Sequence, residues 1–298
     1  MDSIPMVVIS GQVPNELIGT DAFQETDMLG VSRPVVKHSF MVKEAKEIPD
    51  VVHKAFHIAT TGRPGPVVID VPKDTTDPAH LAAYIRPTDL RLRSYTPATS
   101  GNSRQIRKAL EALVAAERPV LYVGGGVVQA DGSDALRKLV RMLRCPVANT
   151  LMGLGAYPGE DDLCIGMLGM HGTYEANMVM HETDLIFAIG ARFDDRVTND
   201  PSKFAPNATI VHVDVDPASI SKIVGVDIPI VGNAKLVLEE LVLNAEVHLE
   251  TQSKSEKLAF QDRGLRWWSQ INEWRRQHGL NHRLKANPDQ PILPQLAI

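Results

Sequence analysis

Short apolar runs alternate with stretches of helical period along the whole chain. The runs are rich in valine, isoleucine and leucine, and they predict strands at residues 6–9, 66–71, 119–123, 146–148, 185–189, 210–215 and 228–231. Most of these strands are apolar at every position, which is typical of parallel strands covered by helices on both faces. The pattern therefore predicts an α/β fold of parallel sheets flanked by helices.

Three helices are expected between the strands. Pro49 suits the first turn of one helix, Ser103 is expected to cap another, and a third begins near Ser133. Apolar residues recur in each with the spacing of a single buried helix face. These residues are Val52, Ala55, Phe56 and Ala59 in the first helix, Ile106, Leu110, Leu113 and Val114 in the second, and Leu136, Leu139, Val140 and Leu143 in the third. Each helix thus has one face with which to pack on a sheet.

Two polar segments divide the chain. Residues 87–101 are rich in turn-forming residues and lack a hydrophobic period, so we expect a domain boundary there and a second one near residues 251–256. The predicted organisation is a first domain over residues 1–90, a linker over 91–101, a central domain over 102–250 and a helical segment over 251–298. The three tryptophans of the chain share that last helix, where packing against the main body and ligand stacking are the two interpretations.

Composition limits the class of protein further. The 298 residues exceed the usual ~150-residue domain, and 44% hydrophobic with 22% charged residues is ordinary globular usage. Basic residues number 31 against 36 acidic ones and are scattered, so nucleic acid is not an expected partner. No apolar run approaches the ~20 residues that span a bilayer, so no membrane contact is expected. Cys145 and Cys164 are expected to be small buried residues of a protein in a reducing compartment, the cytoplasm.

Both ends of the chain suggest that it is an internal piece of a longer protein. A predicted strand begins within the first ten residues, with no charged leader before it. The last eight residues are mostly apolar, where natural termini are usually polar.

Glycines follow the strand predicted at residues 119–123. Gly124, Gly125 and Gly126 carry no side chains, so a ligand could lie against their backbone at the carboxyl edge of a parallel sheet. The dinucleotide fingerprint G-x-G-x-x-G fails, because Gln129 replaces its third glycine and the next helix is expected only near Ser133. Nucleotide binding and a simple tight turn both remain open.

Charged residues follow two further strands. Asp214 and Asp216 end the strand at residues 210–215, a position from which a carboxylate can accept hydrogen bonds from ribose hydroxyls. The alternative is that Asp216, which precedes a proline, only caps the following helix. Arg192 and Arg196 lie in a loop after the strand at residues 185–189, among aspartates. They could hold a phosphate or carboxylate, or form a structural ion-pair network.

A metal site is not predicted. His53 and His57 are four residues apart on an expected helix, but Lys54 stands where the H-E-x-x-H motif has its glutamate.

Seven segments, taken together and in order, resemble the acetolactate synthase (acetohydroxyacid synthase) large-subunit family. They lie at residues 18–25, 62–66, 70–74, 122–126, 166–172, 191–198 and 214–217. The Gly-Arg-Pro-Gly-Pro segment and the following Pro-Lys-Asp are shared widely among thiamine-diphosphate enzymes. Met-Leu-Gly-Met-His-Gly and Arg-Phe-Asp-Asp-Arg-Val-Thr are more specific to this family.

The resemblance implies a domain for each part of the chain. Residues 1–90 would be the later part of a pyrimidine-binding domain, and residues 102–250 a complete, doubly wound central FAD-binding domain. Residues 251–298 would be a helical linker towards a diphosphate-binding domain that lies outside these residues.

The same resemblance implies a transferase that decarboxylates pyruvate on thiamine diphosphate with Mg²⁺. It then joins the product to a second 2-keto acid, pyruvate or 2-ketobutyrate, in branched-chain amino acid biosynthesis, while FAD is structural. The motifs that activate and anchor thiamine diphosphate are absent here, so these residues alone are expected to be inactive. The alternatives are a catalytically silent FAD-binding module and a related enzyme such as glyoxylate carboligase or pyruvate oxidase.

Site residues and partners follow from the resemblance as well. Arg196 would grip the acceptor carboxylate, and the pocket around it would be shaped by Phe23, Gln24, Lys73 and Met170. The residues implied for FAD are Arg63, Gly124, Gly125, Gly126, Thr150, Leu151, Met152, His171, Gly190, Arg192, Asp214, Gly232 and Asn233. A homodimer or homotetramer is implied, and some members of the family also bind a small regulatory subunit.

Overall fold

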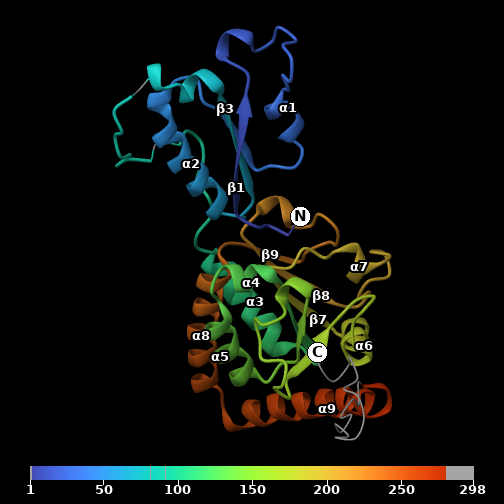
Figure 1. Ribbon diagram of the computed structural model, residues 1–298. Coiled ribbons are helices and arrows are strands. Elements are labelled where there is room, and N and C mark those ends of the chain that lie inside the picture. The colour runs from blue at the N-terminus through green and yellow to red at the C-terminus, as the bar shows by residue number, and fades with distance from the viewer. Residues whose placement is uncertain (1, 81, 91, 280–298) are drawn as a thin grey trace, which may run out of the picture. The chain divides into compact units, whose positions relative to one another are not determined.

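The computed structural model describes residues 2–80, 82–90 and 92–279 (Figure 1). It divides into two compact units, Met1–Ala98 and Thr99–Ile298. The division falls inside the polar segment at residues 87–101 that the sequence marks as a boundary. Each unit has its own parallel sheet, so the α/β prediction is confirmed.

The first unit holds a three-stranded parallel sheet in the order β1-β3-β2. The strands are β1 (Met6–Gln12), β2 (His38–Met41) and β3 (Pro66–Pro72). The helices are α1 (Met28–Ser32) and α2 (Ile48–Thr60), with 3₁₀ turns η1 (Asn15–Leu17), η2 (Ala45–Glu47), η3 (Lys73–Thr76) and η4 (Pro78–His80). Strand β2 was missed because it is short and begins with two polar residues.

Helix α2 begins where Pro49 predicts, but its buried face is rotated from the expected one. Ala55 and Ala59 are buried as expected, whereas Phe56 is 57% exposed. Val51 and Ile58 are buried instead, against the central strand β3. The prediction for Phe56 is therefore wrong, because several apolar residues on this helix fit more than one face.

The second unit holds a six-stranded parallel sheet in the order β6-β5-β4-β7-β8-β9. The strands are β4 (Pro119–Val123), β5 (Val147–Asn149), β6 (Cys164–Met167), β7 (Leu185–Ile189), β8 (Thr209–Asp214) and β9 (Ile228–Val231). The chain builds outward from β4 to β6, then crosses to the other side of β4 and builds outward again. This is the doubly wound order 3-2-1-4-5-6. The short strand β6 was missed.

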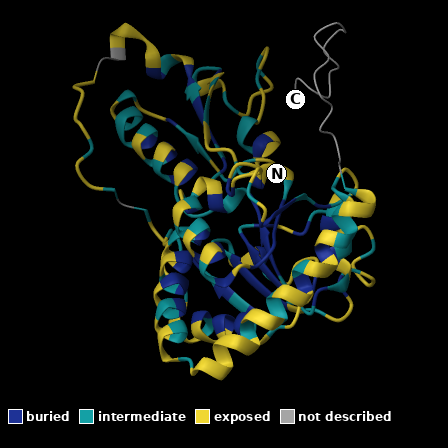
Figure 2. Ribbon diagram, turned by 90° about the horizontal axis from the view of Figure 1, so that it is seen from below, coloured by how far each residue is buried: buried dark blue, intermediate teal, exposed yellow. Residues whose placement is uncertain are grey.

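Helices cover both faces of the second sheet. They are α3 (Ser103–Ala115), α4 (Gly125–Gln129), α5 (Ser133–Leu143), α6 (Tyr174–Glu182), α7 (Asp195–Thr198), α8 (Ala234–Thr251) and α9 (Lys254–His278), with 3₁₀ turns η5 (Leu151–Gly153) and η6 (Pro217–Ser219). Leu121 and Val123 of β4 face α3, α5 and α8, whereas Val120 and Tyr122 face α6 and α9. Figure 2 shows the result, in which buried strands are enclosed by helices with exposed outer faces.

Two helix starts differ from expectation. Asn102, not Ser103, is the N-cap of α3, and its side chain accepts hydrogen bonds from the backbone N–H groups of Arg104 and Gln105. After β4 the chain enters the short helix α4 at Gly125, before α5 begins at Ser133 as predicted. The glycines permit this immediate turn because they carry no Cβ.

Helix α9 is part of the second unit, and residues 280–298 of the expected helical linker lie outside the described residues. The α9 residues Trp267 and Ile271 are buried against the rest of the unit. The Trp267 indole N–H donates to the Pro119 carbonyl oxygen at 3.1 Å. The Trp268 indole N–H donates to the Arg144 carbonyl oxygen at 2.7 Å. The packing interpretation of these tryptophans is therefore confirmed. None of the described helices combines the length and apolar character needed to cross a membrane.

The packing of α9 predicts the effect of removing its central anchor. Trp267→Ala should lower the free energy of unfolding by about 3–5 kcal/mol, because it empties a buried aromatic site. Leu265→Ala, on the exposed side of the same helix at 68% exposure, should change it by less than about 0.5 kcal/mol. Urea unfolding of both variants tests this, and equal losses would contradict the packing role.

Candidate functional site at the carboxyl edge of the second sheet

Most of the predicted cofactor residues in the second unit follow the ends of parallel strands. Gly124 follows β4, Thr150 follows β5, Gly190 follows β7, Asp214 ends β8 and Gly232 follows β9. Because the strands are parallel, these residues lie along one edge of the sheet. The chain reverses its direction of growth between β4 and β7, and ligands of open α/β sheets bind at such a switch point.

The loops after β4 and β7 are in backbone contact at this switch point. The Gly126 N–H donates to the Gly190 carbonyl oxygen at 3.1 Å, and the Gly124 N–H donates to the Ile189 carbonyl oxygen at 2.9 Å. A Cβ on Gly126 would lie 2.7 Å from the Gly190 Cα, and one on Gly124 would overlap the Gly190 carbonyl oxygen. Packing between the two loops thus requires these glycines by itself, as the tight-turn interpretation holds.

The loop after β7 carries both predicted arginines. Arg192 forms an ion pair with Asp194. The Asp194 carboxylate also accepts the backbone N–H of Arg196 at 2.9 Å and so caps the start of α7. This N–H group and the Arg192 guanidinium hold the pKa of Asp194 below its usual range. The Arg196 side chain is 72% exposed, and its Nε forms a long ion pair, at 3.9 Å, with the carboxylate of Asp195. Such an exposed pair is weak, so the Arg196 guanidinium remains available to a ligand.

Met170 and Arg196 are brought together by the backbone. The Met170 N–H donates to the Arg196 carbonyl oxygen at 2.9 Å, and the absent side chain of Gly169 allows the close approach. The Met170 side chain is 65% exposed. An apolar side chain and an arginine, both accessible, therefore stand beside each other at the sheet edge.

Exposed apolar side chains also follow β5. Leu151 is 69% exposed and Met152 is 46% exposed, both in η5. Exposed apolar groups gathered at a strand-end edge are typical of a ligand surface. Together with the glycines and Arg192, they give this edge the apolar and polar groups that a large dinucleotide with a flat ring system needs, so the residues fit FAD.

Several predicted cofactor residues also have local structural roles. The Thr150 hydroxyl caps η5, and the Asn233 side chain caps α8 by accepting two backbone N–H groups. A Cβ on Gly232 would lie 2.7 Å from the Gly101 nitrogen. His171 is exposed. Capping and packing account for three of these positions without a ligand.

The two aspartates after β8 divide their roles. Asp216 caps η6 through the N–H of Ala218, so the capping interpretation is confirmed for this residue. Asp214 accepts the N–H of Asp216 at 2.8 Å and lies 3.8 Å from Nε2 of His212. Asp214 therefore keeps the strand-end position from which it was predicted to reach a ribose.

Four predicted site residues belong to the first unit. Phe23 is 89% exposed, and Gln24 has a left-handed backbone with φ of 63°. Their loop is held by Glu25, whose pKa is lowered by the backbone N–H groups of Gly19 and Ala22.

Arg63 donates from Nε to the Ser3 hydroxyl at 2.8 Å, and Lys73 opens η3. The roles implied for these two residues, and for Phe23 and Gln24, stay predictions.

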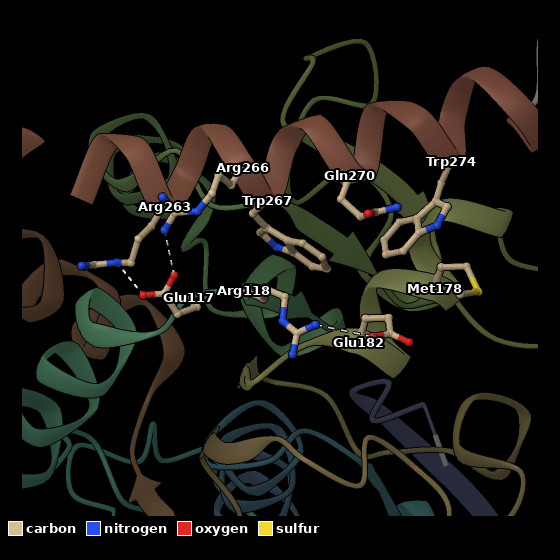
Figure 3. A pocket seen from close by; sticks show the side chains of 9 residues that line it. All are labelled: Glu117, Arg118, Met178, Glu182, Arg263, Arg266, Trp267, Gln270 and Trp274. Carbon is tan, nitrogen blue, oxygen red and sulfur yellow. Dashed lines mark hydrogen bonds and ion pairs between the residues drawn. The ribbon is translucent and has the colours of Figure 1, made fainter. Parts of the chain in front are cut away.

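A pocket of about 590 Å³ lies at the other, amino end of the second sheet (Figure 3). Glu117 and Arg118 precede β4, and Glu182 ends α6 just before β7. Arg118 pairs with Glu182 at 3.5 Å, and Glu117 pairs with Arg266 at 3.2 Å. Its charged groups pair with one another beneath α9, and the pocket contains none of the predicted site residues.

No metal centre emerges from the part of the chain that the structure describes. Within it, no three histidine, cysteine, aspartate or glutamate side chains gather as metal ligands would. His53 and His57 lie on α2, and both cysteines are buried free thiols.

Two buried residues of this edge were not singled out from the sequence. His212 is 1% exposed, and its Nε2 lies 2.8 Å from the Ala191 carbonyl oxygen. Phe193 is 2% exposed and has a left-handed backbone with φ of 54°. The histidine within the apolar run at residues 210–215 was the available signal, because a buried polar side chain requires a partner.

Comparison with known proteins identifies the fold. The central domain of thiamine pyrophosphate enzymes matches residues 106–241, within the doubly wound unit. Residues 106–241 thus belong to the central-domain family of thiamine pyrophosphate enzymes.

Curated relatives of the chain include acetolactate synthase large subunits. The one from Buchnera aphidicola subsp. Schizaphis graminum is 53% identical over 98% of this chain, and that from Haemophilus influenzae is 56% identical over 92%. The isozyme 3 large subunit from Escherichia coli is 52% identical over 100%. These alignments cover 49%, 46% and 50% of the relatives, so the chain spans about half the length of the curated relatives it matches.

The glycine contact at the switch point gives a first prediction for the site. Gly124→Ala should destabilise the protein by about 1–3 kcal/mol or more, because its Cβ would meet backbone that cannot move aside. Gly225→Ala is the matched control, since nothing lies within 4 Å of its added Cβ. Equal melting temperatures for the two variants would show that the loops do not pack closely.

The burial of His212 gives a second prediction. Burial lowers the pKa of His212 to about 4, against about 6.5 in an unfolded chain. Between these values the unfolded chain binds the proton more readily, so stability is complete above pH 6.5 and falls towards pH 4. On going from pH 7 to pH 5, the wild type should lose about 1–2 kcal/mol more than His212→Gln in urea unfolding. Parallel losses would place His212 in a solvated environment.

Proposed function

We propose that the chain forms the FAD-binding domain and pyrimidine-domain residues of an acetolactate synthase large subunit. The protein would decarboxylate pyruvate and condense the product with a second 2-keto acid for branched-chain amino acid synthesis in the cytoplasm. The observation that supports the proposal is the doubly wound second unit, in which Gly124, Gly190 and Asp214 lie at the carboxyl ends of parallel strands. Identities of 52–56% to large subunits favour this substrate over those of glyoxylate carboligase or pyruvate oxidase.

FAD is the ligand proposed for the carboxyl edge. Its phosphates would lie near the backbone of Gly124–Gly126 with Arg192 as their cationic partner, and a ribose would lie near Asp214. The exposed side chains of Leu151 and Met152 would cover apolar ring surface. The Arg192 side chain is 45% exposed and already has an anionic partner in Asp194. A phosphate must therefore share Arg192 with Asp194 or displace it.

Arg196 would hold the acceptor 2-keto acid. Its guanidinium is exposed, its pair with Asp195 is long, and a planar fork binds a carboxylate through two hydrogen bonds. Met170, fixed beside it, would exclude water from the reacting carbons. Phe23, Gln24 and Lys73 of the first unit are proposed to bind the 2-keto acid as well. Thiamine diphosphate, when bound with Mg²⁺, supplies the electron sink for decarboxylation.

Assembly is proposed from the names of the relatives. Each is called a large subunit, which implies a small-subunit partner for those proteins. We infer a homodimer or homotetramer for this protein, with a small regulatory subunit as a further partner. A catalytically silent FAD-binding module is the second candidate, and an assay of acetolactate formation separates the two.

The role of Arg196 predicts a specific kinetic defect. In the full large subunit, Arg196→Lys keeps the charge but loses the bidentate fork. Use of the 2-keto acid should fall by about 30- to 150-fold in kcat/KM, which corresponds to the ~2–3 kcal/mol of one charge-assisted pair. Flavin affinity should be unchanged, because Arg192 is the residue assigned to FAD. Steady-state kinetics on pyruvate, beside a flavin titration, measures both.

Arg266→Lys is the matched control, since Arg266 lies at the amino end of the sheet and pairs with Glu117. Its kinetics should match those of the wild type. Unchanged kinetics in Arg196→Lys with a lower melting temperature would reduce Arg196 to an ion-pair partner of Asp195. Flavin binding without any acetolactate formation by the full large subunit would support the silent module.

A further inference from the structure

Three residues form a row across neighbouring strands beneath the loop that carries the arginines. Tyr122 of β4 is paired in register with Ala188 of β7, which is paired with His212 of β8. Neighbours in register point to the same face of a sheet. All three are buried, and the small side chain of Ala188 leaves space between the two larger rings.

Phe193 fills that space from the loop above. Its ring centroid lies 5.5 Å from that of Tyr122 and 5.1 Å from that of His212, with both contacts edge to face. Its left-handed backbone, with φ of 54°, is rare for a bulky side chain. Such a conformation persists only where the surroundings impose it, and such residues cluster at ligand sites.

The loop has a second attachment two residues before Phe193. His212 donates from Nε2 to the Ala191 carbonyl oxygen at 2.8 Å, because a carbonyl oxygen can only accept a hydrogen bond. Burial lowers the pKa of His212 to about 4, so the neutral ring carries its single proton on Nε2. Residues 191 and 193 are thus tied to the same side chain, one by a hydrogen bond and one by ring contact. Arg192, between them, is directed away from the core at 45% exposure.

The attached loop also determines the position of Arg196. Asp194 follows Phe193 directly, pairs with Arg192 and caps α7, the helix that contains Arg196. Tyr122 reaches this group through its ring contact with Phe193, which directly precedes Asp194. A shift of Phe193 would therefore move both arginines.

We propose that Tyr122, Phe193 and His212 form an aromatic anchor that positions Arg192 for the flavin phosphate and Arg196 for the acceptor carboxylate. None of the three touches the ligand; His212 acts as a positioning residue through the Ala191 carbonyl, and Phe193 through its own backbone. The anchor rests on the proposed function, because it places residues that function assigns. Its consequence is that a change in the core alters binding at the sheet edge.

Variants of His212 test the hydrogen bond. His212→Phe retains a ring against Phe193 but loses the N–H donor, whereas His212→Gln can still donate to the Ala191 carbonyl. In a flavin titration of the full chain, His212→Phe should bind FAD about 3- to 10-fold more weakly, as expected for one lost hydrogen bond. His212→Gln should bind within about twofold of the wild type. Wild-type affinity in His212→Phe would overturn the role of His212.

Variants of Tyr122 test the ring contact independently, should His212→Phe fail to fold. Tyr122→Phe keeps the ring and should leave FAD affinity unchanged. Tyr122→Leu removes the edge-to-face contact and should weaken affinity severalfold. Equal affinity in both Tyr122 variants would overturn the aromatic anchor.

A destabilised core variant separates positioning from general loss of stability. Leu139→Ala empties a buried site on α5, on the opposite face of the sheet. It should lower the melting temperature yet leave FAD affinity unchanged at temperatures where the protein is folded. Weakening equal to that of His212→Phe would reduce the anchor to ordinary core packing.

Arg192→Gln distinguishes failure of the anchor from failure of the proposed function. If Arg192→Gln weakens FAD binding tenfold or more while His212→Phe and Tyr122→Leu do not, the anchor alone is wrong. If Arg192→Gln has no effect, FAD does not bind as proposed and the anchor falls with the function. Weakening in all three, with wild-type affinity in Leu139→Ala, supports both.

Discussion

The contact between two glycine-rich loops at the switch point of the second sheet governs the rest of the candidate site. Gly124 and Gly126 after β4 lie against Gly190 after β7, so closely that even a methyl group would collide with backbone. This contact fixes the loop after β4 against the first residue of the loop after β7, which carries Arg192 and which we call the arginine loop (residues 190–194). The positions of Arg192, Asp194 and α7 all follow from the path that the chain takes out of Gly190.

The arginine loop shows how a buried core determines the geometry of an exposed site. Asp194 joins the two arginines, because it pairs with one side chain and accepts the backbone N–H of the other. Phe193 and His212 fix the same loop from below. The charged groups are accessible to ligands, while the residues that orient them are shielded from water. The relatives at 52–56% identity provide the family context in which these exposed groups acquire a proposed chemistry.

Apolar strands and strand-end residues were the predictable part of the structure. Five of the six strands of the second sheet are apolar runs between turns, and their parallel order places the ends of those strands at one edge. Strand β6 was not predicted because it has four residues and includes Gly166. Helix α4 was not predicted because it begins with glycines, which indicate turns more readily than helices. The buried face of α2 shows that helical periodicity alone does not determine which of several neighbouring apolar residues pack in the core.

The aromatic anchor was beyond local pattern for a physical reason. Tyr122, Ala188 and His212 meet only through strand register, and Phe193 reaches them through a backbone conformation that its residue type disfavours. Both are consequences of tertiary packing. The pairing of Arg192 with Asp194 was anticipated as an alternative to ligand binding, and the structure shows this pair as partly exposed.

Hydrogen exchange with and without FAD tests the central claim, that the carboxyl edge of the second sheet is the flavin site, most directly. Mass spectrometry of the full chain reports protection for each peptide. FAD should slow exchange in peptides covering residues 124–126, 190–196 and 214–216. It should leave exchange unchanged in peptides covering residues 117–118 and 178–182, at the opposite pocket. Protection confined to the amino-end pocket beneath α9, or no protection at all at saturating FAD, would contradict the claim.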